Sequence, residues 1–329
     1  MSNRSLISRI SYYRRVLSAY ARPSRSQLSF WHDAPEVNEN APLDALGEYY
    51  MAFLEKADYA GPFDADGVPL LDYRGRLGRQ YNPIAIAQYA LGNHSRWKRG
   101  GGERRKTVFF QMADWLAAHL EQNEHGLSMW HHHFDWEYRD VLKAPWYSGL
   151  AQGQGVSVLV RAHQESGDSR YLTAATRAFE ALVQPVSQGG TLSTSDNGDV
   201  WIEEYLVTPP THVLNGFIWA LWGVRDFGLA TGDKRADSLF ERSVESFRSC
   251  LARYDTGYWS LYEISGHRLP MLASPFYHRL HIAQLRCMHR LTNEQFFDAW
   301  ADRWQGYEDR RLPRLRALGG KLVFKALYY

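Results

Sequence analysis

Three short stretches in the second half of the sequence carry side chains that can take up or release a proton. The residues are Glu203, Glu204 and Tyr205 in the first stretch, Tyr262 in the second, and Tyr277, His278 and His281 in the third. Carboxylates, phenols and imidazoles are common general acids and bases. These residue types point to proton transfer on a bound molecule, provided that the fold brings the three stretches together.

A repeated pair of helices is the element that would bring them together. Two copies align at Gly167-Asp168 and Gly232-Asp233. An apolar segment stands before each turn and a segment with one apolar face follows it, as expected for an inner and an outer helix. The pairs are residues 84–91 with 109–120, 154–160 with 171–182, 214–222 with 240–251, and 278–291 with 296–304. The sequence therefore predicts a mainly α fold of about four helical hairpins in a ring, whose inner helices line a cleft.

Two segments interrupt the helical repeat. In residues 189–207 and 254–262, turn residues alternate with β-branched and aromatic residues, which is typical of short strands joined by turns. Each segment is predicted to form a small β-hairpin at one end of the cleft. Loops held on a rigid scaffold often carry functional residues, and both segments contain members of the proton-transfer set.

The amino-terminal part has a different character. Residues 1–80 are predicted to form a helix and an extended arm packed on a main domain of residues 81–329. Within residues 4–20, apolar side chains occupy one helical face and arginines the other. This pattern fits a helix packed on the domain, and it also fits a helix in peripheral contact with an anionic membrane.

Composition excludes several classes of protein. The formal net charge is +2, from 38 Lys and Arg against 36 Asp and Glu, so nucleic acid is not an expected partner. Cys250 and Cys287 lack metal-ligand spacing and are expected to be reduced core residues of a cytoplasmic protein. No stretch approaches the roughly 20 apolar residues of a membrane span, and no signal peptide is recognisable. An oligomer is compatible with the sequence.

Six motifs resemble those of a known family, in the same order. They are Tyr81-Asn-Pro-Ile-Ala-Ile-Ala-Gln-Tyr-Ala-Leu91, Trp146-Tyr-Ser-Gly-Leu-Ala-Gln-Gly-Gln-Gly155, Glu203-Glu-Tyr-Leu-Val-Thr-Pro209, Val213-Leu-Asn-Gly-Phe217, Tyr254-Asp-Thr-Gly257 and Tyr277-His-x-x-His-Ile-x-Gln-Leu285. The chain is similar to the C-terminal helical domain of the D-glucuronyl C5-epimerases and looks like a short bacterial-type homologue. The resemblance implies that the ring is an incomplete (α/α) toroid of about four helical hairpins, with a cleft that binds a uronic-acid polysaccharide such as heparosan.

The resemblance also implies a reaction, the conversion of D-glucuronate residues to L-iduronate, with catalytic positions at Glu204, Tyr205, Tyr262 and Tyr277. Inverting C5 requires removal of a proton on one face of the ring and return of a proton on the other. Glu204 is expected to be the base on one face and Tyr277 the proton partner on the other. Tyr205 and Tyr262 would hydrogen-bond the substrate carboxylate or assist the transfer.

Ten polar residues near the motifs are expected to contact the polysaccharide. They are Arg79, Tyr81, Asn82, Gln88, Tyr147, Gln152, Gln154, Asn215, His278 and His281. The glutamines and the asparagine at 215 stand on apolar inner helices and need hydrogen-bond partners, which sugar hydroxyls or neighbouring backbone would provide. One of the two histidines would also orient Tyr277. No cofactor and no metal is expected.

Alternative interpretations of single residues remain open. Each tyrosine also fits a core aromatic with a satisfied hydroxyl. Residues 131–137, His-His-His-Phe-Asp-Trp-Glu, are the best alternative site, because imidazoles and carboxylates bind divalent metals. Glu203 and Glu204 would point to opposite faces of a strand, so at most one enters the cleft and the other is a surface or supporting carboxylate.

Alternative functions remain open as well. A polysaccharide lyase would begin with the same proton abstraction, and a hydrolase would need paired carboxylates, for which Glu204 with Asp255 or Glu263 is a loose candidate pair. A non-catalytic glycan-binding or assembly protein belongs to a different class. After Tyr262 the chain continues Glu263-Ile-Ser-Gly-His267, where the family carries an arginine. This departure leaves the polymer open, and a bacterial envelope glycan is a further candidate.

Overall fold

The computed structural model describes residues 25–138, 141–265 and 269–328, together with the single positions 14, 18 and 22; of residues 322 and 325–328 it describes the backbone alone. The amphipathic segment predicted at residues 4–20 lies, apart from positions 14 and 18, outside the described residues. The proposed division of the chain near residue 80 stays a prediction.

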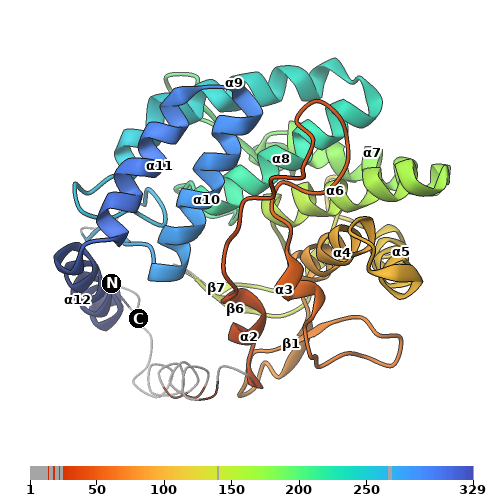
Figure 1. Ribbon diagram of the computed structural model, residues 1–329, viewed down its shortest axis with the longest axis horizontal. Coiled ribbons are helices and arrows are strands. Elements are labelled where there is room, and N and C mark those ends of the chain that lie inside the picture. The colour runs from red at the N-terminus through yellow and green to blue at the C-terminus, as the bar shows by residue number, and fades with distance from the viewer. Residues whose placement is uncertain are drawn as a thin grey trace.

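Four helical hairpins form the body of the molecule (Figure 1). They are α4 (Pro83–Lys98) with α5 (Gly102–Ala118), α6 (Gly149–Ser166) with α7 (Ser169–Val183), α8 (Leu214–Thr231) with α9 (Lys234–Cys250), and α10 (Pro275–Thr292) with α11 (Gln295–Glu308). A further helix, α12 (Arg311–Tyr328), follows. The predicted mainly α toroid of about four hairpins is confirmed.

The order of inner and outer helices follows from the distribution of apolar residues. Helix α8 is buried without interruption from Leu214 to Val224, and α4 is buried from Pro83 to Ser95. Helices α7 and α9 bury one face only, as the amphipathic pattern of their sequences requires. The first helix of each pair therefore lies inside and the second lies outside.

The Gly-Asp pairs stand at the turns of two hairpins because each residue suits the backbone geometry of its position. Gly167 and Gly232 end α6 and α8 with φ angles of 72° and 69°, a left-handed conformation that glycine adopts without steric cost. The following aspartates cap the next helix, because the side chain of Asp168 accepts from the backbone N–H of Arg170 at 2.9 Å. Asp233 makes the equivalent bond in the second hairpin.

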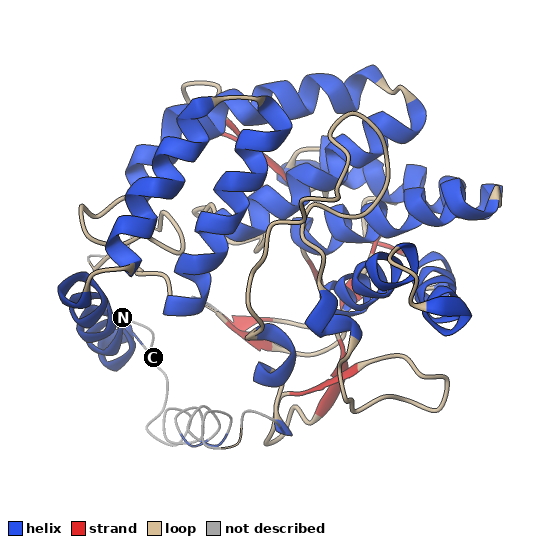
Figure 2. Ribbon diagram, viewed as in Figure 1, coloured by secondary structure: helices blue, strands red, loops and turns tan. Residues whose placement is uncertain are grey.

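Short strands connect the hairpins (Figure 2). Strands β9 (Leu192–Thr194) and β10 (Val200–Ile202) pair antiparallel, which confirms the first predicted β-hairpin. At residues 254–262 the prediction of a hairpin is only partly right, because the chain forms the isolated bridges Asp255↔Ser260 and Leu261↔Leu272 rather than strands.

Four further antiparallel pairs were not predicted, because their strands have two or three residues and show no periodicity. They are β1 (Leu70–Asp72) with β2 (Arg79–Tyr81), β3 (Glu121–Gln122) with β4 (Ser128–Met129), β5 (His131–His132) with β8 (Trp146–Tyr147), and β6 (Trp136–Glu137) with β7 (Val141–Leu142). The last three of these pairs lie in the connection between the first two hairpins and shape one side of the molecule.

The arm, residues 25–57, contains the short helices α2 (Leu28–Trp31) and α3 (Leu54–Ala57) and runs across the inner helices (Figure 1). Its carbonyl groups accept hydrogen bonds near the carboxyl ends of those helices. Arg161 of α6 donates to Gly47 at 2.8 Å, and Arg290 of α10 donates to Asn38 at 2.6 Å. The arm thus covers one end of the toroid.

A buried ion pair fastens the arm and two inner helices together. The guanidinium of Arg161 donates to Asp226 of α8 at 2.5 and 3.1 Å, and the hydroxyl of Tyr50 donates to the same carboxylate at 2.8 Å. Both charged side chains are at most 2% exposed. Removing one partner of such a pair leaves the other charge buried without compensation.

We expect Arg161→Met to lower the free energy of unfolding by about 3–5 kcal/mol, measured from urea denaturation midpoints. Tyr50→Phe removes one hydrogen bond to the same carboxylate and should cost about 1–3 kcal/mol. Equal, small losses for both variants would show that the ion pair contributes little.

None of the helices in the described part of the chain is long and apolar enough to cross a bilayer.

Candidate active site

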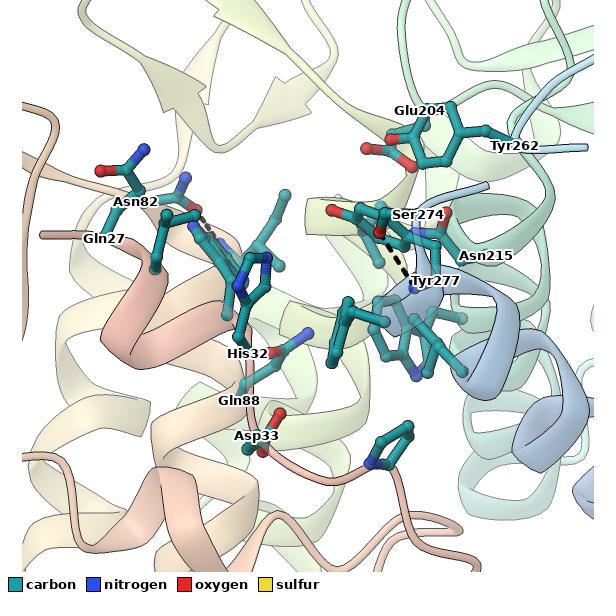
Figure 3. Close-up of a pocket in the computed structure, with 18 of the residues that line it drawn as sticks. Gln27, His32, Asp33, Asn82, Gln88, Glu204, Asn215, Tyr262, Ser274 and Tyr277 are labelled. Carbon is teal, nitrogen blue, oxygen red and sulfur yellow. Dashed lines mark hydrogen bonds between the residues drawn. The ribbon is translucent and has the colours of Figure 1, made fainter. Parts of the chain in front are cut away.

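A cavity of about 320 Å³ lies at the amino-terminal ends of the inner helices (Figure 3). First-turn residues of all four inner helices line it. They are Ile84 of α4, Leu150 of α6, Asn215 of α8, and Phe276 and Tyr277 of α10. A volume of this size is at the lower end of small-molecule sites.

The helix ends give the cavity an electrostatic bias. The amino-terminal end of a helix carries a partial positive charge and several free backbone N–H groups, both of which favour an anion. In α8 the N-cap residue Val213 makes no side-chain capping bond. In the other three inner helices the cap is filled, because the side chains of Asn82, Ser148 and Ser274 accept from first-turn N–H groups of α4, α6 and α10. A carboxylate bound in the cavity would therefore find its most favourable helix end at the first turn of α8.

Glu204 is the buried carboxyl group of this cavity. It follows β10, is 4% exposed and packs on the first turn of α8 at Gly216. Its Oε2 has no hydrogen-bond partner among the described residues. Burial raises the pKa of Glu204 to about 8; the neighbouring phenol of Tyr205 lowers it in part, and the charge of Glu263 raises it further. A carboxyl with a pKa near neutrality can both accept and donate a proton.

Glu203 turns away from the cavity lining. It accepts hydrogen bonds from the hydroxyl of Ser193 and from the backbone N–H of His212 at 3.1 Å, and its Oε1 lies 2.7 Å from the ring Nδ1 of His212. The prediction that only one of the two carboxylates enters the cleft is therefore consistent with the structure. Glu203 is a supporting group and not a surface residue, because it is 2% exposed.

The three predicted tyrosines line the same cavity as Glu204. The rings of Tyr262 and Tyr277 meet edge to face with centroids 4.9 Å apart, and Figure 3 shows Tyr262 beside Glu204. Burial, and then the charge of Glu204, raise the pKa of both Tyr205 and Tyr262 well above 10. These two phenols are therefore neutral and serve as hydrogen-bond donors.

Several side chains of the cavity wall have a polar atom without a hydrogen-bond partner in the described residues. The side-chain oxygens of Gln88 and Asn215 and the indole N–H of Trp219 are buried, and none has a hydrogen-bond partner in the described residues. All three residues line the cavity. Because a buried polar atom without a partner is costly, a ligand rich in hydroxyl groups would satisfy them.

Seven of the ten predicted substrate contacts lie outside the cavity lining. They are Arg79, Tyr81, Tyr147, Gln152, Gln154, His278 and His281, whereas Asn82, Gln88 and Asn215 do line it. The hydrogen bonds that most of these seven make account for their placement, and their contact with a polysaccharide stays a prediction.

Gln152 shows how a buried amide is satisfied by the fold itself. Its oxygen accepts from the N–H of Trp130 at 2.9 Å, and its nitrogen donates to the carbonyls of Ser128 and Ala178 at 3.1 Å. Gln154 accepts from Gln88 at 3.1 Å. Sugar hydroxyls and neighbouring backbone were the two expected kinds of partner for such an amide, and Gln152 binds backbone.

Three polar residues lie on the periphery. Tyr147 donates to the carbonyl of Gly189 at 2.9 Å, and Tyr81 is 42% exposed and donates to Asp64 at 2.7 Å. Arg79 is an exposed residue of the edge strand β2. Strand geometry that periodicity did not predict places all three away from the cavity.

His278 and His281 form a buried cluster with Ser260, and the prediction that one of them orients Tyr277 stays a prediction. The Oγ of Ser260 lies 2.8 Å from Nδ1 of His278 and 3.0 Å from Nδ1 of His281. Burial lowers the pKa of His278 to about 4 and that of His281 well below its usual value. Both imidazoles are neutral, and their contacts with Ser260 hold the start of α10 against the connection that precedes it.

Sequence reasoning missed the contribution of the arm. Trp31, His32 and Asp33 line the cavity, and so does Lys56, whose buried ammonium donates to Asp33 at 3.0 Å. Nothing in the helical periodicity signals this, because the arm reaches the cavity through tertiary packing.

The sequence pattern also did not predict that aromatic residues between α5 and α6 reach the cavity. Trp136, Tyr138 and Trp146 line the cavity, and Tyr138 donates a hydrogen bond to the buried carboxylate of Glu263. The high density of aromatic residues between α5 and α6 was the sequence feature that could have indicated their role in the cavity wall.

In the described residues no group of three or more His, Cys, Asp or Glu side chains is placed to hold a metal ion. His131 and His133 approach Glu121, whereas His132 stacks on the ring of Trp146 with centroids 3.8 Å apart. The three consecutive histidines therefore face different surroundings.

Fold and cavity together define an (α/α) toroid whose cavity, at the amino-terminal ends of its inner helices, is lined by a buried carboxyl group and the three predicted tyrosines. Residues 122–306 match the family described as D-glucuronyl C5-epimerase C-terminus, and the chain belongs to that family. It is 31% identical over 220 residues to a D-glucuronyl C5-epimerase of Caenorhabditis elegans, which covers 62% of this chain and 35% of the worm protein.

Two further proteins are similar. An uncharacterized protein of Methanocaldococcus jannaschii, MJ1128, is 30% identical over 196 residues, which covers 59% of this chain and 62% of that protein. The chain thus spans about a third of the worm protein and less than two thirds of the archaeal one. Cellobiose 2-epimerase from Spirochaeta thermophila has a similar fold, with a TM-score of 0.52 and 12% identity over 93% of this chain and 87% of that chain.

Gly216 provides the space that Glu204 occupies. A Cβ added at Gly216 would lie 2.7 Å from Cβ of Glu204 and would collide with its carboxylate. We expect Gly216→Ala to displace Glu204 and to lower activity by at least about tenfold, since a displacement near 1 Å can cost a hundredfold. Gly306→Ala, a helical site with open space around it, is the matched control and should leave activity unchanged.

The raised pKa of Glu204 predicts a dependence of stability on pH. The native state holds its proton up to about pH 8, whereas the unfolded chain releases it near 4.5. Because the native state binds more protons between these values, this contribution to stability is fully present below pH 4.5 and is lost as the pH rises to 8. Melting curves of the wild type and of Glu204→Gln at both pH values should show a steeper decline for the wild type.

Proposed function

We propose that the protein is a polysaccharide uronate C5-epimerase that converts D-glucuronate residues to L-iduronate. The observation that supports this most directly is the placement of Glu204 and Tyr277 in one cavity, on different elements. Inversion at C5 needs two proton-transfer groups that reach the ring from different sides. Family membership agrees with this reaction.

In the proposed reaction the deprotonated fraction of Glu204 removes the proton from C5, and the electron pair of the C–H bond moves into the substrate carboxylate to form an enediolate. Tyr205 and Tyr262, as neutral phenols, donate hydrogen bonds to the developing charge, and the helix ends stabilise it further. Tyr277 then delivers a proton to the opposite face of C5 and takes up a new proton from solvent, while Glu204 releases the abstracted proton to solvent. The reverse direction uses the same groups with their roles exchanged.

The charges of the cavity wall favour a substrate of low charge density. Besides the protonated Glu204, the wall includes four acidic residues and two lysines, which are Asp33, Glu36, Glu55 and Glu137 against Lys56 and Lys321. Like charges repel a densely sulfated chain, whereas a single uronate carboxylate can be placed at the first turn of α8. An unsulfated polymer such as heparosan is the first substrate to test.

The experiment is incubation with heparosan and other uronate polymers in deuterated water. Deuterium at C5 together with new iduronate signals in the NMR spectrum would establish the epimerase. Ultraviolet absorbance of an unsaturated uronate would instead establish a lyase, which begins with the same proton abstraction. Binding without either product would establish a glycan-binding protein and overturn the proposal.

A further inference from the structure

Helix α12 carries an exposed apolar stripe. Leu312, Leu315 and Leu318 are 80%, 65% and 51% exposed, and Val323 is 54% exposed. Half of the exposed large apolar side chains in the described residues belong to this one helix. Single exposed leucines are ordinary on protein surfaces, but a contiguous row of them marks an interaction site.

The opposite face of α12 is fixed to the body of the protein. Ala317 and Phe324 are each 3% exposed, and Lys321 donates to the carbonyl of Leu272 at 2.8 Å. Lys321 and Phe324 also line the cavity. The helix is therefore held with its leucines directed outward, and Figure 1 shows it at the outer edge of the molecule beside α11.

The charge of α12 identifies the partner. Residues 311–328 contain three arginines and two lysines and no Asp or Glu. All three arginines, Arg311, Arg314 and Arg316, are exposed. A second copy of the chain packed through α12 would bring two basic helices together, which is unfavourable, whereas an anionic bilayer complements both the charge and the apolar stripe.

We infer that α12 seats the protein on an anionic bilayer. The leucines enter the boundary between headgroups and acyl chains, about 5–10 Å deep, and the arginines meet the anionic headgroups. Because the inner face of the same helix lines the cavity, the cavity lies roughly one helix diameter, about 10 Å, from the membrane. This binding is independent of the chemistry in the cavity.

The test is flotation of the full chain with vesicles of phosphatidylcholine, alone or mixed with phosphatidylglycerol. We expect binding to the anionic vesicles, weakened by salt, and little binding to the neutral ones. Leu315→Gln combined with Leu318→Gln should lower partitioning by on the order of a hundredfold, because each buried leucine contributes about tenfold or more. Leu43→Gln, an exposed leucine on the arm, is the matched control and should bind as the wild type does.

Two results would overturn the inference. One is vesicle binding of the double variant equal to that of the wild type, with circular dichroism showing that both are folded. The other is a wild type that does not bind anionic vesicles. If that wild type is also a dimer by light scattering and the leucine substitutions dissociate it, the stripe is covered by a second copy. C5 deuterium exchange on a soluble polymer should be the same in the double variant and the wild type, so that failure of membrane binding is distinguishable from failure of the proposed reaction.

Discussion

Glu204→Gln is expected to lower the rate of hydrogen exchange at C5 by on the order of 10²–10⁴-fold, the usual contribution of a general base. The substitution keeps the shape of the side chain but replaces the carboxylate proposed to take the proton with an amide, which cannot take it. It also removes the buried carboxyl whose pKa is raised to about 8, so the protein should remain folded and become more stable at high pH. The measurement is deuterium incorporation by NMR, with binding of the polymer measured in parallel.

Glu203→Gln is the matched control for that experiment, since the two residues are neighbours with the same chemistry and similar burial. It loses strength in the hydrogen bonds to Ser193 and His212 and should cost about 1–3 kcal/mol of stability while the folded protein still exchanges C5 hydrogen. If Glu203→Gln abolished exchange and Glu204→Gln did not, the assignment of the base would be wrong.

Much of the fold was predictable because the helical hairpins obey local rules. The apolar run from Leu214 onward can only be an inner helix, and the Gly-Asp turns supply both the stop of one helix and the cap of the next. The short strands were not predictable, since strands such as His131–His132 are made by tertiary pairing with Trp146–Tyr147 rather than by their own propensity.

The lining of the cavity was predictable in its centre and not at its edges. Glu204 and Tyr205 follow β10, Tyr262 lies in the connection that precedes α10, and Tyr277 stands in the first turn of α10, so that all four meet at the amino-terminal ends of the inner helices. Residue type alone could not separate a buried glutamine that faces the cavity from one that binds backbone, and Gln88 and Gln152 differ in this respect.

The contribution of the arm depends on contacts between residues far apart in the chain. Trp31 and Asp33 reach the wall because Lys56, which follows more than twenty positions later, binds both Asp33 and the carbonyl of Phe30. Hydrogen bonds of this kind do not affect the spacing of apolar residues along the chain, so the hydrophobic pattern cannot predict them.

Tyr277→Phe is expected to abolish epimerisation, lowering the rate by at least about a hundredfold, because it removes the one hydroxyl proposed to serve the second face of C5. The ring stays in place, since it packs edge to face on Tyr262 and the backbone N–H of Tyr277 is capped by Ser274. Stability should therefore change little.

Tyr262→Phe is the informative comparison, since it removes a phenol from the same aromatic pair. Because Tyr262 is proposed to donate a hydrogen bond to the enediolate and not to carry the proton, its loss should slow exchange by a smaller factor and leave both epimers reactive. Exchange started separately from glucuronate and iduronate polymers measures this difference. Full epimerisation by Tyr277→Phe would contradict the two-sided mechanism, whereas a greater loss in Tyr262→Phe than in Tyr277→Phe would transfer the second proton-transfer role to Tyr262.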